Sequence, residues 1–240
     1  MARRWAADGR DLALAARRLD ELERLREELL SAHPGITVSV HPLDVTDPAA
    51  VGEVVDDAVA ALGGLDRVVA NAGTGQGGPI GTGQAAGNRA TALTNFVGTL
   101  NQAESALRHF RGVGRGHFVV ISSVSAVRGM GGAMNAYSAS KAGVTALADG
   151  LRTDLLGTAI RVSAVHPGYV DTALAAGLPG KIFTAGLERG TAAIVDAVER
   201  ERPRAYVPAW PWVPLSVLMR VAPLPVFRLF ASGRPRTGSH

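Results

Sequence analysis

Apolar and polar residues follow one another in blocks that predict short buried strands separated by amphipathic helices. The continuous apolar runs 12–16 and 118–122 are typical of strands that are covered on both faces. Leucines three and four positions apart, among Glu and Arg, predict a helix over 19–30. The remaining expected strands are 36–40, 68–70, 160–165 and 205–207, and the remaining expected helices are 48–62, 84–110, 135–156 and 188–201. Strands that alternate with helices indicate the α/β class, with a parallel sheet covered by helices on both faces.

The end of the chain departs from this alternation, so we treat residues 1–207 as one domain and 208–231 as a separate segment. This segment is apolar, but it contains five prolines together with Arg220 and Arg228. A membrane-spanning helix needs about 20 mostly apolar residues without such breaks. We therefore interpret 208–231 as a lid or packing segment on or near the substrate side, with a contact at the membrane interface as the less favoured alternative. The tail 232–240 is expected to be disordered.

The composition supports a folded core and excludes several kinds of site. Apolar residues make up 47% of the 240 residues and charged residues 19%. There is no cysteine, so disulfides, thiolate metal sites and a thiol nucleophile are excluded, and we expect no metal site. The net charge of +4 comes with arginines that are scattered along the chain, which indicates a solvated surface rather than a nucleic-acid site. The first ten residues lack the apolar core of a secretory signal, and we expect a cytoplasmic protein.

Tyr137 and Lys141 are the strongest candidates for chemistry. They are four residues apart in the helix expected over 135–156, which places both side chains on one face. An ammonium beside a phenol favours the phenolate, and such a phenol transfers a proton to or from a carbonyl or alcohol oxygen near neutral pH. Only two of the 25 basic Lys and Arg residues are lysines, so a lysine at 141 argues against a chance surface pair.

Two serines, Ser122 and Ser123, end the strand expected over 118–122. Ligands of open α/β sheets bind beyond the carboxyl ends of the strands, so a serine at this position is placed to donate a hydrogen bond to a substrate oxygen. Ser123 is the preferred candidate. Ser125 is the less favoured one, because it lies beyond the strand end.

Taken in order, these motifs resemble the short-chain dehydrogenase/reductase family over roughly residues 1–207. The matching segments are Leu43-Asp44-Val45, Ala70-Asn71-Ala72-Gly73, Thr94-Asn95-Phe96, Ile121-Ser122-Ser123, Tyr137-Ser138-Ala139-Ser140-Lys141 and Pro167-Gly168-Tyr169-Val170-Asp171-Thr172. Each motif is weak alone, but six in the family's order are specific. The resemblance implies a Rossmann-like, doubly wound parallel sheet. It also implies an oxidoreductase that interconverts a carbonyl and a secondary alcohol by hydride transfer with a nicotinamide cofactor.

The resemblance also implies roles for individual residues. Tyr137 is the acid/base, and Lys141 supports it and binds the nicotinamide ribose. Ser123 orients the substrate oxygen, and Asn95 holds a proton-relay water. The implied cofactor-binding residues are Asp44, Val45, Asn71, Ala72, Gly73, Tyr137, Lys141, Pro167, Gly168, Val170 and Thr172. Ser123 lies one residue further from Tyr137 than is usual in the family, and the glycine-rich loop 128–133 accommodates the extra residue. A small apolar substrate and a homodimer or homotetramer complete the expectation.

The arginines that follow the first strand, Arg17 and Arg18, favour NADP over NAD. Folds that bind NAD usually place an acid here to accept a hydrogen bond from the ribose 2′-hydroxyl. A guanidinium instead binds a 2′-phosphate through two parallel hydrogen bonds. In the alternative interpretation the pair only marks the solvated start of a helix, and NAD is the less favoured cofactor.

The sequence lacks the first strand of the family and the glycine-rich turn that binds the diphosphate. Residues 1–9 are similar to the second half of the helix that follows this turn. Gly73, Gly75 and Gly78 spell G-x-G-x-x-G, but no helix opens after them, so they do not supply the turn. We therefore expect either an empty position in the sheet between strands 12–16 and 68–70 or a rearranged N-terminus.

Two explanations of this absence are open. In the favoured one, the natural chain begins upstream of Met1. In the other, the chain is truncated, and it is unstable or is completed by a strand from a partner. The absence also keeps open an alternative function, a non-catalytic cofactor-sensing or partner-binding member of the same fold.

Overall fold

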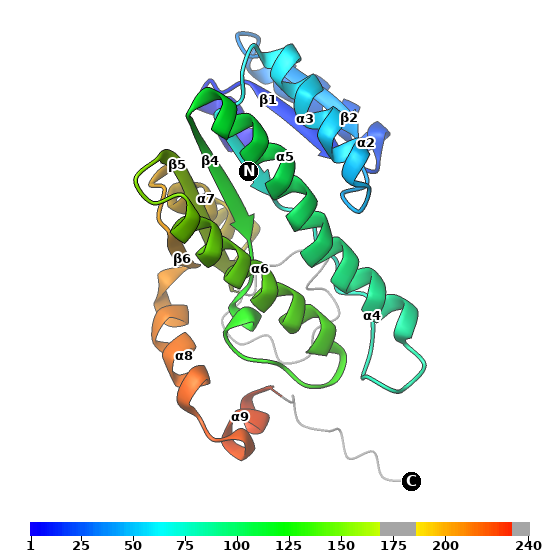
Figure 1. Cartoon of the computed structure of the whole chain (residues 1–240), viewed down its shortest axis with the longest axis vertical. Helices are drawn as coiled ribbons and strands as arrows, with labels where there is room; N and C mark the ends of the chain where they lie inside the picture. The colour runs from blue at the N-terminus through cyan, green and yellow to red at the C-terminus, as the bar shows by residue number, and fades with distance from the viewer. Residues whose placement is uncertain (169–185, 232–240) are drawn as a thin grey trace.

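Strands and helices alternate along the chain as the hydrophobic pattern predicts (Figure 1). The computed structural model describes residues 1–168 and 186–231, so Val170, Thr172 and the tail 232–240 lie outside the described residues. The strands are β1 (Leu12–Ala16), β2 (Val38–Pro42), β3 (Arg67–Ala70), β4 (Arg115–Ile121), β5 (Ala159–Pro167) and β6 (Arg204–Val207). The helices are α1 (Ala2–Ala7), α2 (Leu19–Ala32), α3 (Pro48–Leu62), α4 (Ala85–Ala92), α5 (Gly98–Val113), α6 (Asn135–Asp154), α7 (Leu187–Glu199), α8 (Ala209–Val221) and α9 (Leu224–Ala231), with short 3₁₀ turns at Val124–Val127 and Gly132–Met134.

The six strands form two parallel sheets with a gap between them. β1 pairs with β2, and β3, β4, β5 and β6 pair in that order. In the part of the chain that the structure describes, no strand lies between β1 and β3, and residues 2–7 form α1 instead. A cavity of about 1500 Å³ lies there, with Leu12 and Leu14 of β1 and Val69 of β3 in its walls. The empty position expected in the sheet is therefore confirmed.

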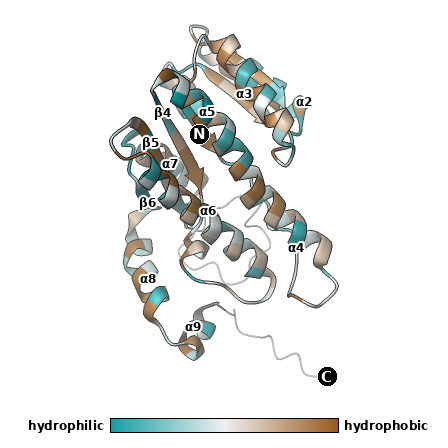
Figure 2. Cartoon of the chain, viewed as in Figure 1, coloured by the Kyte–Doolittle hydropathy of each residue, from teal (hydrophilic) through white to brown (hydrophobic). Residues whose placement is uncertain are grey.

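Helices cover both faces of the four-stranded sheet, because successive side chains of a strand point to opposite faces. Phe118 and Val120 of β4 are fully buried in one cluster with residues of α5 and α6. Val119 and Ile121 face the other way and pack with residues of α7 and with Trp5 of α1. Figure 2 shows β4 as a hydrophobic layer beneath helices that are more hydrophilic outside. The doubly wound α/β architecture is confirmed.

Helices, rather than strand pairing, join the two sheets. On one face α1 packs against the β1–β2 half through Ala6. Its Trp5 packs against the other half and donates a hydrogen bond of 2.7 Å to Glu199 of α7. On the opposite face α3 packs on α5, where Arg108 and Asp56 form an ion pair at 2.9 Å. The two halves thus keep their places without a shared strand.

Two segments differ from the sequence-based expectation. The single helix expected over 84–110 consists of α4 and α5 joined by a π turn, Leu93–Val97. Such turns within α-helices occur frequently at functional sites. The segment 208–231, where the pattern predicts no helix, forms α8 and α9. Its prolines precede these helices or stand near their starts, including Pro214 after the kink at Trp210, where a missing N–H costs little.

Candidate active site

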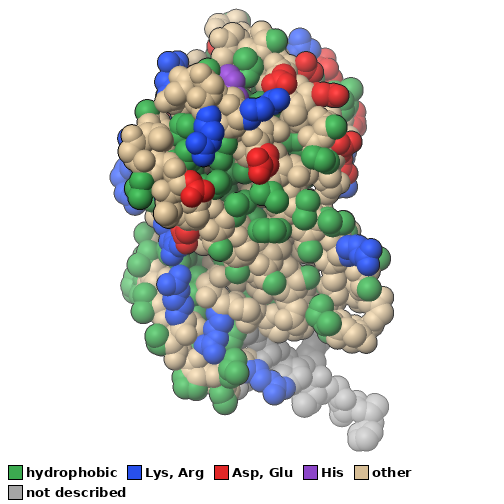
Figure 3. Space-filling view, in the orientation of Figure 1, with side chains coloured by type: hydrophobic (Ala, Val, Ile, Leu, Met, Phe, Trp, Pro, Cys, Tyr) green, Lys and Arg blue, Asp and Glu red, His purple; other side chains and the backbone are tan. Residues whose placement is uncertain are grey.

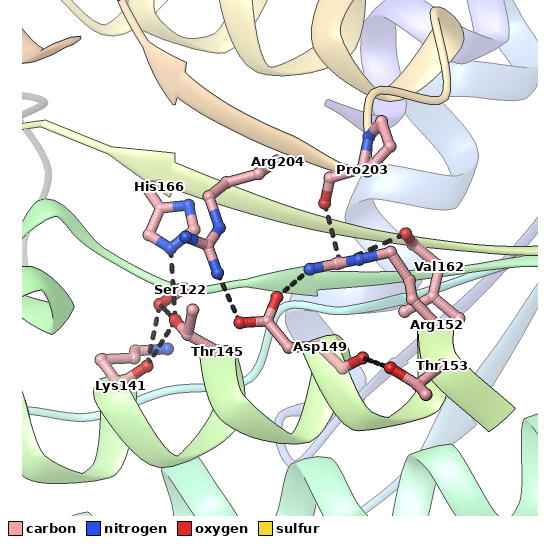
Figure 4. Close-up of polar contacts among 10 residues, drawn as sticks. All are labelled: Ser122, Lys141, Thr145, Asp149, Arg152, Thr153, Val162, His166, Pro203 and Arg204. Atoms are coloured by element: carbon pink, nitrogen blue, oxygen red, sulfur yellow. Dashed lines mark hydrogen bonds and ion pairs between the residues drawn. The ribbon is translucent and has the colours of Figure 1, made fainter.

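Lys141 lies buried at the edge where the carboxyl ends of β4 and β5 meet (Figure 4). It is 4% exposed, and its Nζ donates a hydrogen bond of 2.8 Å to the carbonyl oxygen of Ile121 at the end of β4. Burial lowers the pKa of Lys141 from 10.5 to about 8, because the ammonium loses hydration. Tyr137 lies one turn earlier on α6, half-buried, with its ring centre 6.0 Å from Nζ. The structure therefore brings the two residues of the predicted pair together.

Asn95 is fully buried in the π turn and connects the loop after β3 to α6. Its Oδ1 accepts a hydrogen bond of 2.8 Å from the backbone N–H of Thr74. Its Nδ2 donates to the carbonyl oxygen of Thr74 and to Ser140 Oγ, each at 3.0 Å. Gly73 lies against two of the four predicted catalytic residues, because a Cβ there would be 3.4 Å from Asn95 Oδ1 and 3.4 Å from Lys141 Nζ. The Asn-Ala-Gly loop, Asn95 and Lys141 thus form one contiguous group.

Ser123 follows β4 and is half-buried at the same edge. Its Oγ accepts hydrogen bonds from the backbone N–H and the hydroxyl of Ser125, at 3.2 and 3.0 Å. In the hydrogen bonds of residues 1–168 and 186–231, Ser123 Oγ is an acceptor. Ser125 is buried, and its hydroxyl group donates a hydrogen bond to Ser123. This geometry favours Ser123 as the substrate contact and Ser125 as its support.

A series of polar contacts next to Lys141 connects α6 to β4 and β5 (Figure 4). Ser122 Oγ donates to the Lys141 carbonyl oxygen at 3.0 Å and lies 2.8 Å from Thr145 Oγ1. Thr145 Oγ1 lies 3.2 Å from Nε2 of His166 on β5. Burial lowers the pKa of His166 to about 4, so its ring is neutral at pH 7. The sequence motifs give Thr145 and His166 no role, although Thr145 stands one helical turn after Lys141.

The adenosine end of the predicted cofactor site lies at the ends of β1 and β2. Arg17 follows β1 and is exposed, and within the described ranges it forms no ion pair. Arg18 precedes α2 and lies 4.0 Å from Glu21. Asp44 accepts hydrogen bonds from the backbone and the hydroxyl of Thr46, which lower its pKa, and the charge of Arg17 adds to this effect. Arg17 therefore stands exposed near Asp44, at the ends of β1 and β2.

A cavity of about 640 Å³ connects this end to the loop after β3. The predicted cofactor residues in its walls are Arg17, Arg18, Asp44, Val45, Asn71, Ala72 and Gly73. Val45 packs closely on α5, since a Cβ at Gly98 would be 2.5 Å from Val45 Cγ2. Apolar walls and a guanidinium fit the adenosine part of NAD(P). Among the described residues, no glycine-rich turn opens a helix at this point to hold the diphosphate.

The predicted nicotinamide side is described only in part. Pro167 ends β5, and Gly168 follows it. Trp212 of α8 lies so close that a Cβ at Gly168 would be 2.0 Å from its Nε1, so glycine is required there. Val170 and Thr172 lie outside the described residues. In the described ranges, no group of three or more His, Asp and Glu side chains is arranged to hold a metal ion.

Comparisons with known proteins find similarity to dehydrogenases and other oxidoreductases. A sequence family described as short chain dehydrogenase matches residues 1–181. An uncharacterized oxidoreductase of Mycobacterium tuberculosis is 45% identical over 231 residues, which make up 96% of this chain and 91% of that protein. An alcohol dehydrogenase from the archaeon Thermococcus sibiricus, solved with 5-hydroxy-NADP, is 27% identical with a TM-score of 0.74, over 85% of this chain and 87% of that chain. A short chain dehydrogenase/reductase from Burkholderia phymatum, solved with NAD, shares the fold with a TM-score of 0.79 at 22% identity, over 90% of this chain and 86% of that chain.

Proposed function

Because the chain belongs to the short-chain dehydrogenase/reductase family, and so is a nicotinamide-dependent oxidoreductase, we propose that it uses NADP to interconvert a carbonyl and a secondary alcohol. The observation that carries this proposal is the buried ammonium of Lys141 beside Tyr137. A buried cation that is charged at neutral pH favours the phenolate form of a neighbouring tyrosine. Tyr137 then accepts the proton of an alcohol or donates one to a carbonyl oxygen.

The other residues at this edge would position the substrate and the base. In alcohol oxidation, Tyr137 takes the hydroxyl proton while Ser123 donates a hydrogen bond to the same oxygen. Bound NADP would supply the acceptor for the hydride of the carbinol carbon, and bound NADPH would supply the hydride in the reverse direction. Asn95 holds the loop after β3 against α6, which keeps Gly73 and Lys141 in place. In the proposal it also holds a water through which the proton exchanges with solvent.

NADP is proposed over NAD because of Arg17. This side chain is exposed, lies in the wall of the adenosine cavity and has no ion-pair partner in the described part of the chain. Neither Arg17 nor Arg18 is an acid that would accept a hydrogen bond from a ribose 2′-hydroxyl. A 2′-phosphate would therefore gain a charge-assisted contact that NAD cannot make.

We propose that residues 1–207 form the catalytic domain and that 208–231 cover its substrate side. Arg128, in the loop after Ser123, donates from Nη1 to the carbonyl oxygens of Met219, at 3.1 Å, and Ala222. Met130 from the same loop packs with Met219 and Phe227. Because these contacts place apolar side chains near Ser123, an apolar small-molecule substrate is favoured. A homodimer or homotetramer and a cytoplasmic location remain predictions from family resemblance and sequence.

The replacement Tyr137→Phe tests the acid/base role. It removes only the hydroxyl, so we expect kcat to fall by about a thousandfold on a panel of ketones and secondary alcohols with NADP(H). NADPH affinity, measured by fluorescence, should change little. The matched control is Tyr206→Phe, since Tyr206 stacks on His166 with ring centres 4.8 Å apart and is not assigned to the site. Equal rates in the wild type and Tyr137→Phe would exclude Tyr137 as the acid/base.

A second function, cofactor binding without turnover, is favoured by one observation. The gap between β1 and β3 leaves the described residues without a diphosphate-binding turn. Such a protein would bind NADPH weakly and turn over no member of the panel. Measurable NADPH oxidation with any ketone, abolished in Tyr137→Phe, would decide for the enzyme.

A further inference from the structure

The outer face of α8 and α9 carries an unusual concentration of exposed apolar side chains. Thirteen large apolar side chains are well exposed in the described residues, and seven of them belong to these two short helices. The seven are Trp210, Val213, Val217, Leu218, Val221, Leu224 and Val226. Exposed apolar residues are ordinary when they are scattered, but a contiguous group marks an interaction surface.

The exposed residues follow the periodicity of α8. Val213, Val217 and Val221 are four residues apart and form one stripe, in which Val217 is 60% and Val221 is 73% exposed. The opposite side of the helix is buried through Trp212, Ser216 and Met219. α8 is therefore already packed on the protein by one face, and its second apolar face is left without cover by any described residue.

The charged residues in the sequence of the C-terminal segment have one sign, and α8 and α9 carry Arg220 and Arg228 without any Asp or Glu. After Glu201 the sequence contains no Asp or Glu, whereas it contains six arginines. These are Arg202, Arg204, Arg220, Arg228, Arg234 and Arg236. In Figure 3 the lower left part of the visible face, where α8 and α9 lie in Figure 1, shows hydrophobic and basic side chains. Arg220 stands on the exposed side of α8, next to Val221.

We propose that the outer face of α8 and α9 binds an anionic lipid surface. Trp210 and the valine stripe would enter the interface, and Arg220 would meet the lipid headgroups, as in amphipathic helices that lie in a bilayer surface. A second copy of the chain fits less well, because a two-fold contact would bring this basic face against itself without an acid to offset it. No helix in the described residues is long and apolar enough to cross a bilayer, but a surface contact requires no such helix. This proposal is independent of the proposed reaction.

Flotation of the full chain with vesicles tests the proposal. We expect binding to vesicles of phosphatidylcholine with phosphatidylglycerol, and much weaker binding to phosphatidylcholine alone. The double replacement Val217→Glu with Val221→Glu should reduce binding at least about tenfold. The matched control Leu156→Glu alters a well exposed apolar side chain just before β5, at the opposite edge of the sheet, and should leave binding unchanged. Circular dichroism checks that all variants are folded.

Tryptophan emission gives a second readout that does not depend on these variants. Trp210 is 77% exposed, whereas Trp5 and Trp212 are buried, so a blue shift on adding vesicles reports Trp210. Arg220→Gln keeps the apolar stripe and should lower binding to the anionic vesicles about fivefold. The proposal is wrong if the wild type binds neither vesicle, or if Leu156→Glu weakens binding as much as the double replacement. It is equally wrong if the double replacement converts a dimer to a monomer without any lipid binding, since the face would then join two copies of the chain.

Discussion

The half of the molecule that carries the proposed catalytic residues and the half that carries the proposed adenosine site are held in different ways. β4 lies inside a four-stranded sheet, and its residues 118–120 are fully buried. β1 pairs only with β2, and none of its five residues is fully buried. Asn95 and Lys141 are fixed by hydrogen bonds to protein atoms, whereas Arg17 is exposed and has no ion-pair partner among the described residues. The proposed catalytic side chains are therefore held by hydrogen bonds within the larger half, whereas Arg17 stands in the smaller half, beyond the gap between β1 and β3.

The largest expected difference between the halves concerns stability. Val120→Ala in β4 removes two methyl groups from a fully buried site and should cost about 2–3 kcal/mol. Val40→Ala in β2 makes the same chemical change at a half-buried position and should cost under about 1 kcal/mol. Urea unfolding followed by circular dichroism measures both values. Similar losses of unfolding free energy in the two variants would show that the β1–β2 half is packed as firmly as the four-stranded half. This result would contradict the proposed difference between the halves.

Most of the fold could be predicted from the sequence, because strands buried on both faces leave continuous apolar runs. The run at 12–16 matches β1 residue for residue, and Asp47 caps α3 through the N–H groups of Ala49 and Ala50, as the Asp-Pro pair indicates. The π turn at Asn95 could not be predicted, since a one-residue change in helical hydrogen bonding leaves the apolar pattern intact. The helices α8 and α9 were missed because prolines near a helix start look like breaks when the start itself is unknown.

The site could be predicted only as far as its motifs are local. The spacing of Tyr137 and Lys141 fixes their common helix face, and the pairing of parallel strands brings the Asn-Ala-Gly loop to the same edge. The roles of Ser140 and Thr74 as partners of Asn95 depend on contacts across 45 and 21 residues, which no local pattern encodes. Such partners appear only when the elements are packed together.

In the half that carries the proposed adenosine site, we expect a replacement of Arg17 to have an effect of intermediate size. Arg17→Asp replaces the proposed 2′-phosphate contact with an acid that accepts a hydrogen bond from a 2′-hydroxyl. We expect the ratio of kcat/KM for NADP over NAD to fall by about tenfold or more. Arg18→Asp is the matched control, because Arg18 is near Glu21 and its loss should have a smaller effect. An unchanged preference for NADP in Arg17→Asp would exclude this arginine as the discriminating residue.

Replacement of Lys141 should change activity and stability in opposite directions, and the expected change in stability is small. Lowering the lysine pKa from 10.5 to about 8 corresponds to about 3 kcal/mol of unfavourable burial at pH 7. Lys141→Met removes this cost but also leaves the Ile121 carbonyl oxygen without its hydrogen bond, which offsets about 2 kcal/mol. The variant should therefore be no less stable than the wild type at pH 7, although we expect its turnover to be lost.

The pH dependence of the stability difference between Lys141→Met and the wild type identifies its cause. Below about pH 8 the lysine is protonated in both the folded and the unfolded wild type, so the cost of burying its charge is fully present. Between about pH 8 and 10.5 the unfolded chain binds a proton that the folded chain has lost, so wild-type stability rises with pH. The advantage of Lys141→Met should shrink across this window and reverse at its upper end, where only the lost hydrogen bond counts. Tyr137→Phe, which keeps the lysine, should follow the wild type in stability while losing turnover. Two results would contradict this explanation. One is a lower free energy of unfolding for Lys141→Met than for the wild type at pH 7. The other is a stability difference between the two proteins that does not change between pH 8 and 10.5, which would show that the buried charge of Lys141 does not destabilise the fold.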